Sequence, residues 1–342
     1  MPGLWCLDNA LNVGGGNGYP RLTNGVAAFF LLAVAWLARP RFPQLPGTPV
    51  TPEQAPEFHA LIRDVAAQLQ VSPPAQVTLQ ADVNAFMGHS GFPPRPAPRC
   101  TLGLGLPLWY GLPPQARVAI LAHELAHGRN GDPARSHLIG AALMVLQQLY
   151  VVIMPDENSA PDTVLQIQCS RTGILERITD TGLTLLAQVP YLLYLLLVNL
   201  IGEAQQAAEF RADLLACGVA GTAATAQALE LLHYGEALES ALHKQHHFPE
   251  WANAFLELQH VWATMPDTER HKRRTEPGKR RARLDGSHPP TADRLQVVQA
   301  HPTAATLTLS TERAARIDAE LNAFVKPLAQ QAYQEYRARY DG

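Results

Sequence analysis

Two histidines and a glutamate in the segment His123-Glu124-Leu125-Ala126-His127 have the types and spacing of a metal site. Residues four apart share one face of a helix, so the imidazoles of His123 and His127 can converge on one ion. Glu124 lies one position round the helix, where a carboxylate can act as general base toward a water molecule. The spacing therefore predicts a zinc hydrolase. The alternative is a helix with two histidines that bind no metal.

A catalytic zinc ion requires a third protein ligand from a separate element. Glu209 and Asp213 are four apart in an Ala-rich run, Gly202 to Gly218, that is typical of a helix. We predict Glu209 as the third ligand. We expect Asp213 to accept a hydrogen bond from the ring nitrogen of His123 that does not bind the metal. Alone, the two carboxylates would fit an ordinary surface helix, but the histidine pair favours the ligand interpretation.

Four segments, taken in their order along the chain, extend the pattern. They are Asn84-Ala85-Phe86, HELAHGRNGD at 123–132, EFRAD at 209–213 and SHPPTADR at 287–294. In these segments the chain resembles the HtpX and CAAX-prenyl endopeptidase family of membrane zinc metallopeptidases, over roughly residues 50–300.

The resemblance implies one Zn²⁺ ion per chain, bound by His123, His127 and Glu209, with Glu124 as the general base. It adds His288 as a second catalytic residue, which would stabilise the tetrahedral intermediate of the substrate. It places Asp213 and Arg294 around the metal ligands. These roles are expectations that come from the family's pattern.

The expected fold is α+β and mostly α, a zincin-like metallopeptidase domain with a small edge sheet. Apolar residues at helical spacing predict an amphipathic helix over 51–71. Short strands are expected at Gln76–Leu79 and Arg99–Leu104, and Pro113 and Pro114 open the helix that carries the histidines. Residues 88–98 contain four prolines and two glycines and depart from the family's pattern. The resemblance implies that this insertion borders the place where the family's edge strand lines the substrate.

Two apolar runs, about 138–154 and 182–202, predict a transmembrane helical hairpin, with buried core helices as the alternative. A shorter apolar run, Gly25–Ala38, is marginal as a membrane anchor. Basic residues are more frequent on the catalytic side than in the loop between the two runs. This bias predicts a cell inner or plasma membrane protein whose catalytic domain is cytoplasmic.

We expect three parts: an N-terminal segment (1–45), a zinc metallopeptidase domain (46–305) and a C-terminal amphipathic docking helix (306–342). A chain with a net charge of −3 is not attracted electrostatically to nucleic acid, so no nucleic-acid partner is expected. The basic segment 267–285 is interpreted as a solvated loop or a contact for anionic lipid. Exposed polar surface is the interpretation for the histidines at positions 233, 243, 246, 247 and 260.

The sequence therefore predicts a membrane-associated zinc endopeptidase that acts on peptide or protein substrates and contacts membrane lipid. Two other hypotheses stay open. One is a catalytically silent zinc-binding membrane scaffold, whose cleft the proline-rich segment blocks. The other is a soluble zinc hydrolase with buried apolar helices, which would be extracted in buffer without detergent.

Overall fold

The fold is taken from a computed structural model, which describes residues 45–90, 99–129, 132–154, 174–232, 236–247, 254–264 and 289–340, with isolated residues at 24–36, 266 and 268. Several predictions fall outside the described residues. They concern His233, His288, residues 91–98 of the proline-rich segment, almost all of the basic segment 267–285, and most of the short apolar run 25–38. Contacts divide the chain into two compact units, Met1–Arg41 with Leu138–Ile201, and Phe42–His137 with Gly202–Gly342.

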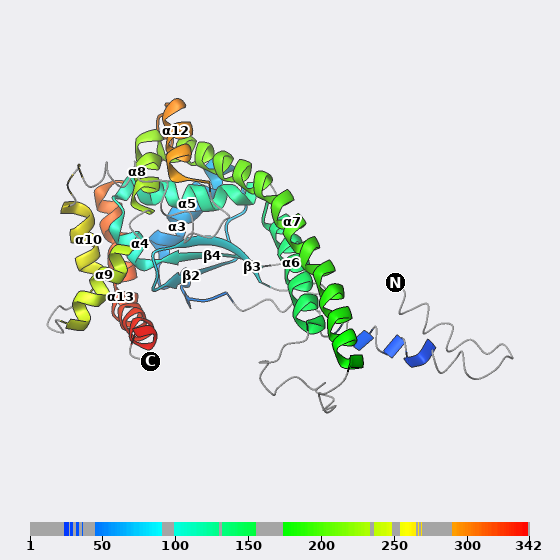
Figure 1. The fold of residues 1–342 in the computed structure, drawn as a ribbon. Coiled ribbons are helices and arrows are strands. Elements are labelled where there is room, and N and C mark those ends of the chain that lie inside the picture. The colour runs from blue at the N-terminus through cyan, green and yellow to red at the C-terminus, as the bar shows by residue number, and fades with distance from the viewer. Residues whose placement is uncertain are drawn as a thin grey trace. The chain divides into compact units, whose positions relative to one another are not determined.

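In the larger unit a small sheet has the strand order β1-β2-β4-β3 (Figure 1). Strand β1 (Thr48–Pro49) is antiparallel to β2 (Gln76–Gln80), which is parallel to β4 (Arg99–Gly105). Strand β3 (Ala85–Ser90) pairs antiparallel with β4 and forms one edge among the described strands. Gly88 to Ser90 therefore belong to this edge strand, and the part of the predicted insertion outside the described residues is 91–98.

Two helices pack together on one side of this sheet, α3 (Pro56–Leu69) and α5 (Pro114–Arg129) (Figure 1). Helix α3 begins with proline at its first position and buries the apolar stripe that the sequence predicts. Helix α5 is buried on most of its surface between Ala116 and Ala126 because its residues there are apolar almost all round. The histidine-bearing helix is thus part of the hydrophobic core. A short helix, α4 (Leu106–Gly111), precedes it.

The C-terminal helix α13 (Thr311–Tyr340) packs in the same unit, with Ile317, Leu321 and Leu328 in the core. Asp318 accepts hydrogen bonds from Trp109 Nε1 (3.0 Å) and Arg117 Nη1 (2.7 Å). Its contacts with α3 are equally specific, because the two oxygens of Glu320 accept the backbone N–H groups of Glu57 and Phe58, each at 3.0 Å. Helix α3 lacks a capping side chain of its own at Ala55, so Glu320 supplies that cap.

Further helices complete this unit. They are α8 (Thr222–Leu232), α9 (Glu236–His247), α10 (Ala254–Thr264) and α12 (Thr291–Ala300). Helix α8 packs against both α5 and α12, and α9 packs against α10 and α13. Through α8, the segment that carries Arg294 is connected to the helix that carries the histidines.

Helix α7 (Ile174–Ala220) is continuous for 47 residues. The apolar run 182–202 and the Ala-rich run 202–218, predicted as two segments, form one helix, because Gly202 does not interrupt it. A single glycine weakens a helix by only about 1 kcal/mol, which helix-forming neighbours can offset. Pro190 also lies within the helix. The apolar run and the predicted third ligand therefore belong to one element.

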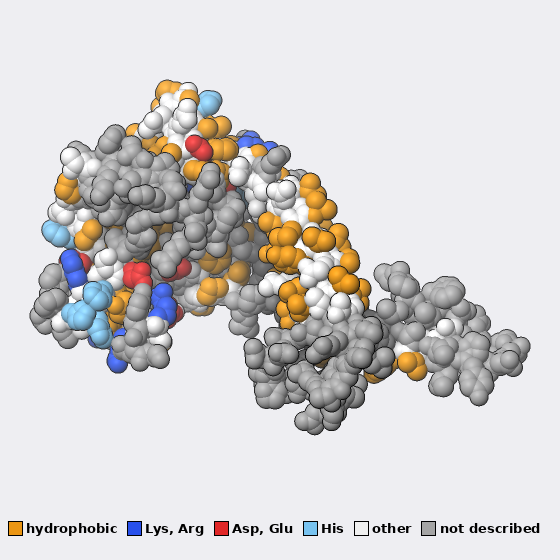
Figure 2. Space-filling view, viewed as in Figure 1, with side chains coloured by type: hydrophobic (Ala, Val, Ile, Leu, Met, Phe, Trp, Pro, Cys, Tyr) orange, Lys and Arg blue, Asp and Glu red, His pale blue; other side chains and the backbone are white. Residues whose placement is uncertain are grey.

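Helix α6 (Asp132–Ile153) enters the smaller unit at Leu138, and there it and the first part of α7 carry apolar side chains. Tyr150 and Tyr191 pack with ring centroids 5.4 Å apart. Among the described residues, one helix, Thr181–Ala220, is long and apolar enough to cross a membrane, and Leu138–Ile153 is a shorter apolar helix. Large hydrophobic side chains of α7 are exposed, as Figure 2 shows. They include Leu185, Leu186, Leu192, Leu196 and Leu200.

Candidate metal centre

Helix α5 presents His123 and His127 side by side, one helical turn apart. Their ring centroids are 5.0 Å apart and their planes are nearly perpendicular, at 88°. His123 is buried and His127 is half-buried, so the pair lies at the border between the core and an accessible face. The helix ends at Arg129, and Gly128 lies inside its last turn.

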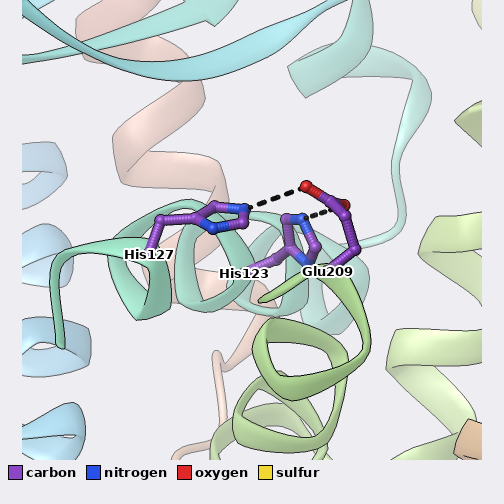
Figure 3. Close-up of side chains that lie close together, drawn as sticks. All are labelled: His123, His127 and Glu209. Atoms are coloured by element: carbon purple, nitrogen blue, oxygen red, sulfur yellow. Dashed lines mark ion pairs between the residues drawn. The ribbon is translucent and has the colours of Figure 1, made fainter. Parts of the chain in front are cut away.

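Glu209 reaches this pair from α7 (Figure 3). Its two carboxylate oxygens face different histidines, with Oε2 3.4 Å from His123 Nε2 and Oε1 3.4 Å from His127 Nε2. The three side chains offer one ligand atom each, and these atoms all lie within 4.8 Å of one another. The structure therefore brings together the two histidines and the glutamate, which are far apart in the sequence.

The three side chains are close enough to share one metal ion. Charge-assisted hydrogen bonds between nitrogen and carboxylate oxygen are about 2.7–2.9 Å long. Two ligands of one tetrahedral zinc ion, each about 2.0–2.1 Å from the metal, are about 3.3 Å from each other. At 3.4 Å, each histidine nitrogen lies farther from its own oxygen of Glu209 than such a hydrogen bond, and near the ligand–ligand separation. Two imidazoles and one carboxylate are also a ligand set that zinc uses in hydrolytic sites.

Asp213, one turn after Glu209 on α7, contacts the other nitrogen of His123. Its Oδ1 lies 2.9 Å from His123 Nδ1, and the residue is fully buried. Burial raises the pKa of the Asp213 carboxyl, but hydrogen bonds from Arg294 and His123 outweigh it and lower the pKa below its usual value. Asp213 is therefore ionised, and it holds His123 with Nε2 directed toward Glu209 and His127.

Arg294 from α12 binds Asp213 through two parallel hydrogen bonds, Nε to Oδ2 and Nη2 to Oδ1, both 2.7 Å long. Its Nη2 is also 3.4 Å from both ring nitrogens of His123. In the ring plane, a nitrogen at this distance from both would overlap the carbon between them, so Nη2 lies over the ring face. Arg294 is buried and its pKa is raised, since the hydrogen bonds and charge of Asp213 outweigh the effect of burial.

The pKa of His123 shows the combined effect of these neighbours. Burial lowers the pKa, but the hydrogen bonds with Asp213 and Glu209 outweigh burial and raise it to about 9. A zinc ligand must be a neutral imidazole. Zinc and a proton therefore compete for His123 Nε2 at neutral pH.

Glu124 is half-buried on α5, directly after His123, and its charge acts on Arg294. Of the site residues expected from the sequence, the structure gathers His123, His127, Glu209, Asp213 and Arg294 in one cluster. The expected catalytic residue His288 lies outside the described residues. The bidentate pair between Asp213 and Arg294 could not be predicted from the sequence, because the spacing within each segment carries no information about pairing across 81 residues.

The α+β fold with its small sheet fits a metallopeptidase domain, and its two helices bring together two histidines and a glutamate that could hold a metal ion. The model of peptidase family M48 matches residues 52–301 of the 342. The chain therefore belongs to peptidase family M48. A search of curated proteins found no match.

Proposed function

We propose that this protein is a membrane-associated zinc endopeptidase of the HtpX and CAAX-prenyl endopeptidase type, which cleaves protein or peptide substrates. The observation that carries the proposal is the convergence of His123, His127 and Glu209 at the separations expected for ligands of one ion. In this proposal the three residues hold one Zn²⁺ per chain. Glu124 stands on the same helix as the two histidines.

Bound zinc would act as a Lewis acid, which polarises the scissile carbonyl and lowers the pKa of water. Glu124 accepts the proton of the water whose oxygen attacks the carbonyl carbon. When the carbon–nitrogen bond breaks, Glu124 passes that proton to the leaving amine. His288 is proposed, on the family's pattern, to stabilise the tetrahedral intermediate of the substrate.

Asp213 and Arg294 are proposed to support the chemistry without touching the substrate. The carboxylate of Asp213 fixes the orientation of the His123 ring, and Arg294 holds both oxygens of that carboxylate in place. Supporting contacts of this kind typically contribute about 10–100-fold to metal affinity or activity.

The edge strand β3 is proposed to line the substrate. It packs beside α5, and in the described sheet only its pairing with β4 is seen. An extended peptide can add to such an edge through main-chain hydrogen bonds, which depend little on sequence. This mode fits an enzyme that acts on many peptide bonds.

Membrane association is supported by the exposed apolar side chains of α7. We propose an inner or plasma membrane location, lipid as a partner, and a cytoplasmic catalytic side. We also propose the division into an N-terminal segment (1–45), a peptidase domain (46–305) and a C-terminal helix (306–342).

The proposal is tested by Glu124→Gln in the purified full chain, in detergent, with casein as substrate. The variant should keep one zinc ion per chain and lose about 10²–10⁴-fold in cleavage rate, because glutamine cannot accept the proton. Chelator should abolish wild-type cleavage. Glu209→Ala should lose zinc, whereas Gln206→Ala, an exposed position on the same helix, should keep it. Undiminished cleavage by Glu124→Gln would rule out this mechanism.

A further inference from the structure

Three histidines lie close together at the end of α9, away from the residues of the metal centre. They are His243, His246 and His247, and α9 ends at His247. Figure 2 shows histidine side chains gathered on the face of the molecule where Figure 1 places α9. His243 and His247 are exposed and His246 is half-buried. The proposed peptidase chemistry uses none of them.

Two of these histidines repeat the arrangement of the pair on α5. His243 and His247 are four residues apart on one helix, as His123 and His127 are. Their ring centroids are 4.5 Å apart with planes at 73°, compared with 5.0 Å and 88° in the α5 pair. Two imidazoles held in this way can offer one nitrogen each to the same ion.

Helix α13 orients two of the rings. The Tyr336 hydroxyl lies 2.8 Å from His243 Nδ1, and the Tyr333 hydroxyl lies 3.3 Å from His246 Nδ1. Tyr336 is itself buried, which limits its movement. With the proton on Nδ1, His243 donates this hydrogen bond to Tyr336 and keeps Nε2 as a metal donor.

Charge near the end of α9 also favours a cation. The last carbonyl groups of a helix carry partial negative charge, and His247 is the last residue of α9. The nearest positive side chain on the helix, Lys244, is paired with Glu257 of α10 at 2.7 Å. A cation on His243 and His247 would therefore lie at the negative end of the helix, with that ammonium already neutralised by a carboxylate.

We propose that His243 and His247 form a second metal site, which takes a divalent transition-metal ion that prefers imidazole, such as Cu²⁺, Ni²⁺ or Zn²⁺. Two exposed nitrogen donors leave the other coordination positions to water. Such a donor set does not suit Mg²⁺ or Ca²⁺, which prefer oxygen. Among the divalent ions Cu²⁺ should bind most tightly. The ion would cross-link the last turn of α9, so the chain would hold one ion beyond that of the metal centre.

Copper titration of the zinc-loaded full chain, purified with a tag that contains no histidine, tests this site. Electron paramagnetic resonance should show Cu²⁺ with two nitrogen ligands. His243→Ala and His247→Ala should each lower the affinity for copper on the order of a hundredfold, because the remaining imidazole binds the ion without a second donor held beside it. His246→Ala is the matched control, since it removes a neighbouring histidine but keeps the pair, and it should bind copper as the wild type does.

Copper that enters the centre of His123 and His127 would be common to all these variants, so the differences between them report on α9 alone. Equal copper binding by wild type and His247→Ala would overturn the proposal, as would an equal loss in His246→Ala. The peptidase readout is separate. His247→Ala should cleave casein at the wild-type rate with zinc, so failure of this site and failure of the proposed peptidase function are distinguishable.

Discussion

His123 is contacted on both of its ring nitrogens and on its face, which makes it the most constrained residue of the centre. Nε2 faces Glu209, Nδ1 faces Asp213, and Arg294 lies over the ring. Each neighbour has a separate effect: Glu209 and Asp213 favour the protonated imidazole, whereas the charge of Arg294 opposes it. The properties of the centre without metal therefore depend strongly on pH.

The free energy of unfolding of the metal-free protein should fall as pH rises from about 6.5 to 9. The pKa of His123 is raised from 6.5 to about 9 in the folded chain, so the protonated ring stabilises the fold below pH 6.5. This stabilisation is lost as pH rises through about 9, and it amounts to roughly 3 kcal/mol. Urea unfolding in chelator at several pH values measures it.

Asp213→Asn serves as the control for this pH dependence, because it removes the carboxylate nearest to Nδ1 and should flatten the profile. Excess zinc should also reverse the trend, since fewer protons compete with the metal at higher pH. A wild-type profile in chelator that is flat from pH 6.5 to 9 would contradict the assigned proton on His123.

Arg294→Met should destabilise the metal-free protein by about 3–5 kcal/mol, because it leaves the buried carboxylate of Asp213 without its bidentate partner. Zinc affinity should fall by about 10–100-fold as the His123 ring loses its support. Arg294→Lys should give a stability and a zinc affinity between those of this variant and the wild type, since lysine keeps the charge but cannot donate two parallel hydrogen bonds. Arg211→Met, at an exposed position of α7, is the control, and equal effects of both would exclude the supporting role.

The positions of some residues of the centre could be predicted from the sequence, and those of others could not. Helical periodicity is local, so the spacing of His123 and His127, or of Glu209 and Asp213, is enough to place each pair on one face. The link between the two pairs came from the needs of zinc chemistry and from the family's pattern. The position of Arg294 over His123 depends on how α12 packs, which no local pattern encodes.

At the scale of elements, the C-terminal helix α13 connects parts of the peptidase unit that are distant in sequence. Its Asp318 accepts a hydrogen bond from Arg117 near the start of α5. Its Glu320 caps α3 by accepting the backbone N–H of Glu57, which lies 263 residues earlier in the chain. Helix α13 also lies beyond residue 301, where the family match ends. The ion pair between Asp318 and Arg117 connects it to α5, the helix that carries His123 and His127.

Asp318→Ala should lower the free energy of unfolding by about 1–3 kcal/mol, because the buried Arg117 guanidinium and Trp109 N–H lose their acceptor. Thermal unfolding of the zinc-loaded full chain measures this loss. Glu335→Gln, an exposed acidic position on the same helix, should change stability very little. If the two variants were equally stable, the contact with α5 would have no energetic role.

The elements were predictable where one short segment decides the outcome. The apolar stripe of α3 and the strands β2 and β4 follow from local patterns. The edge strand β3 includes Gly88, although the sequence predicts it as part of an insertion, because pairing with β4 outweighs the weak strand preference of glycine. The cap from Glu320 could not be predicted, since a cap supplied from so far along the chain depends on tertiary packing.

At the scale of the whole molecule, the exposed leucines of α7 are the feature that is least expected on the surface of a soluble protein. Large exposed apolar surfaces usually mark contacts with a partner or a membrane. The apolar run of α7 is long enough for a membrane span by length and composition. The localisation proposed above therefore depends on this helix.

Leu192→Lys combined with Leu196→Lys should shift the chain from the membrane fraction to the soluble fraction. Each charge in the middle of a span costs about 2.5–3.5 kcal/mol. The measurement is the share of the protein that stays in the pellet after an alkaline carbonate wash. Gln205→Lys with Gln206→Lys, exposed on the same helix outside the apolar run, is the control. Release of the wild-type chain in buffer alone would favour the soluble hydrolase.

The four-residue spacing of Glu209 and Asp213 has one more consequence, for the alignment of α7 against α5. A slip of α7 by four residues, about 6 Å, would bring Asp213 to the position of Glu209 and Cys217 opposite Arg294. The slipped arrangement would still offer a carboxylate to the two histidines. It would, however, set a buried thiol against a guanidinium and leave that charge uncompensated. The pairing of Arg294 with Asp213 thus fixes the alignment of α7 along α5, so that Glu209, and not the carboxylate one turn later, faces the two histidines.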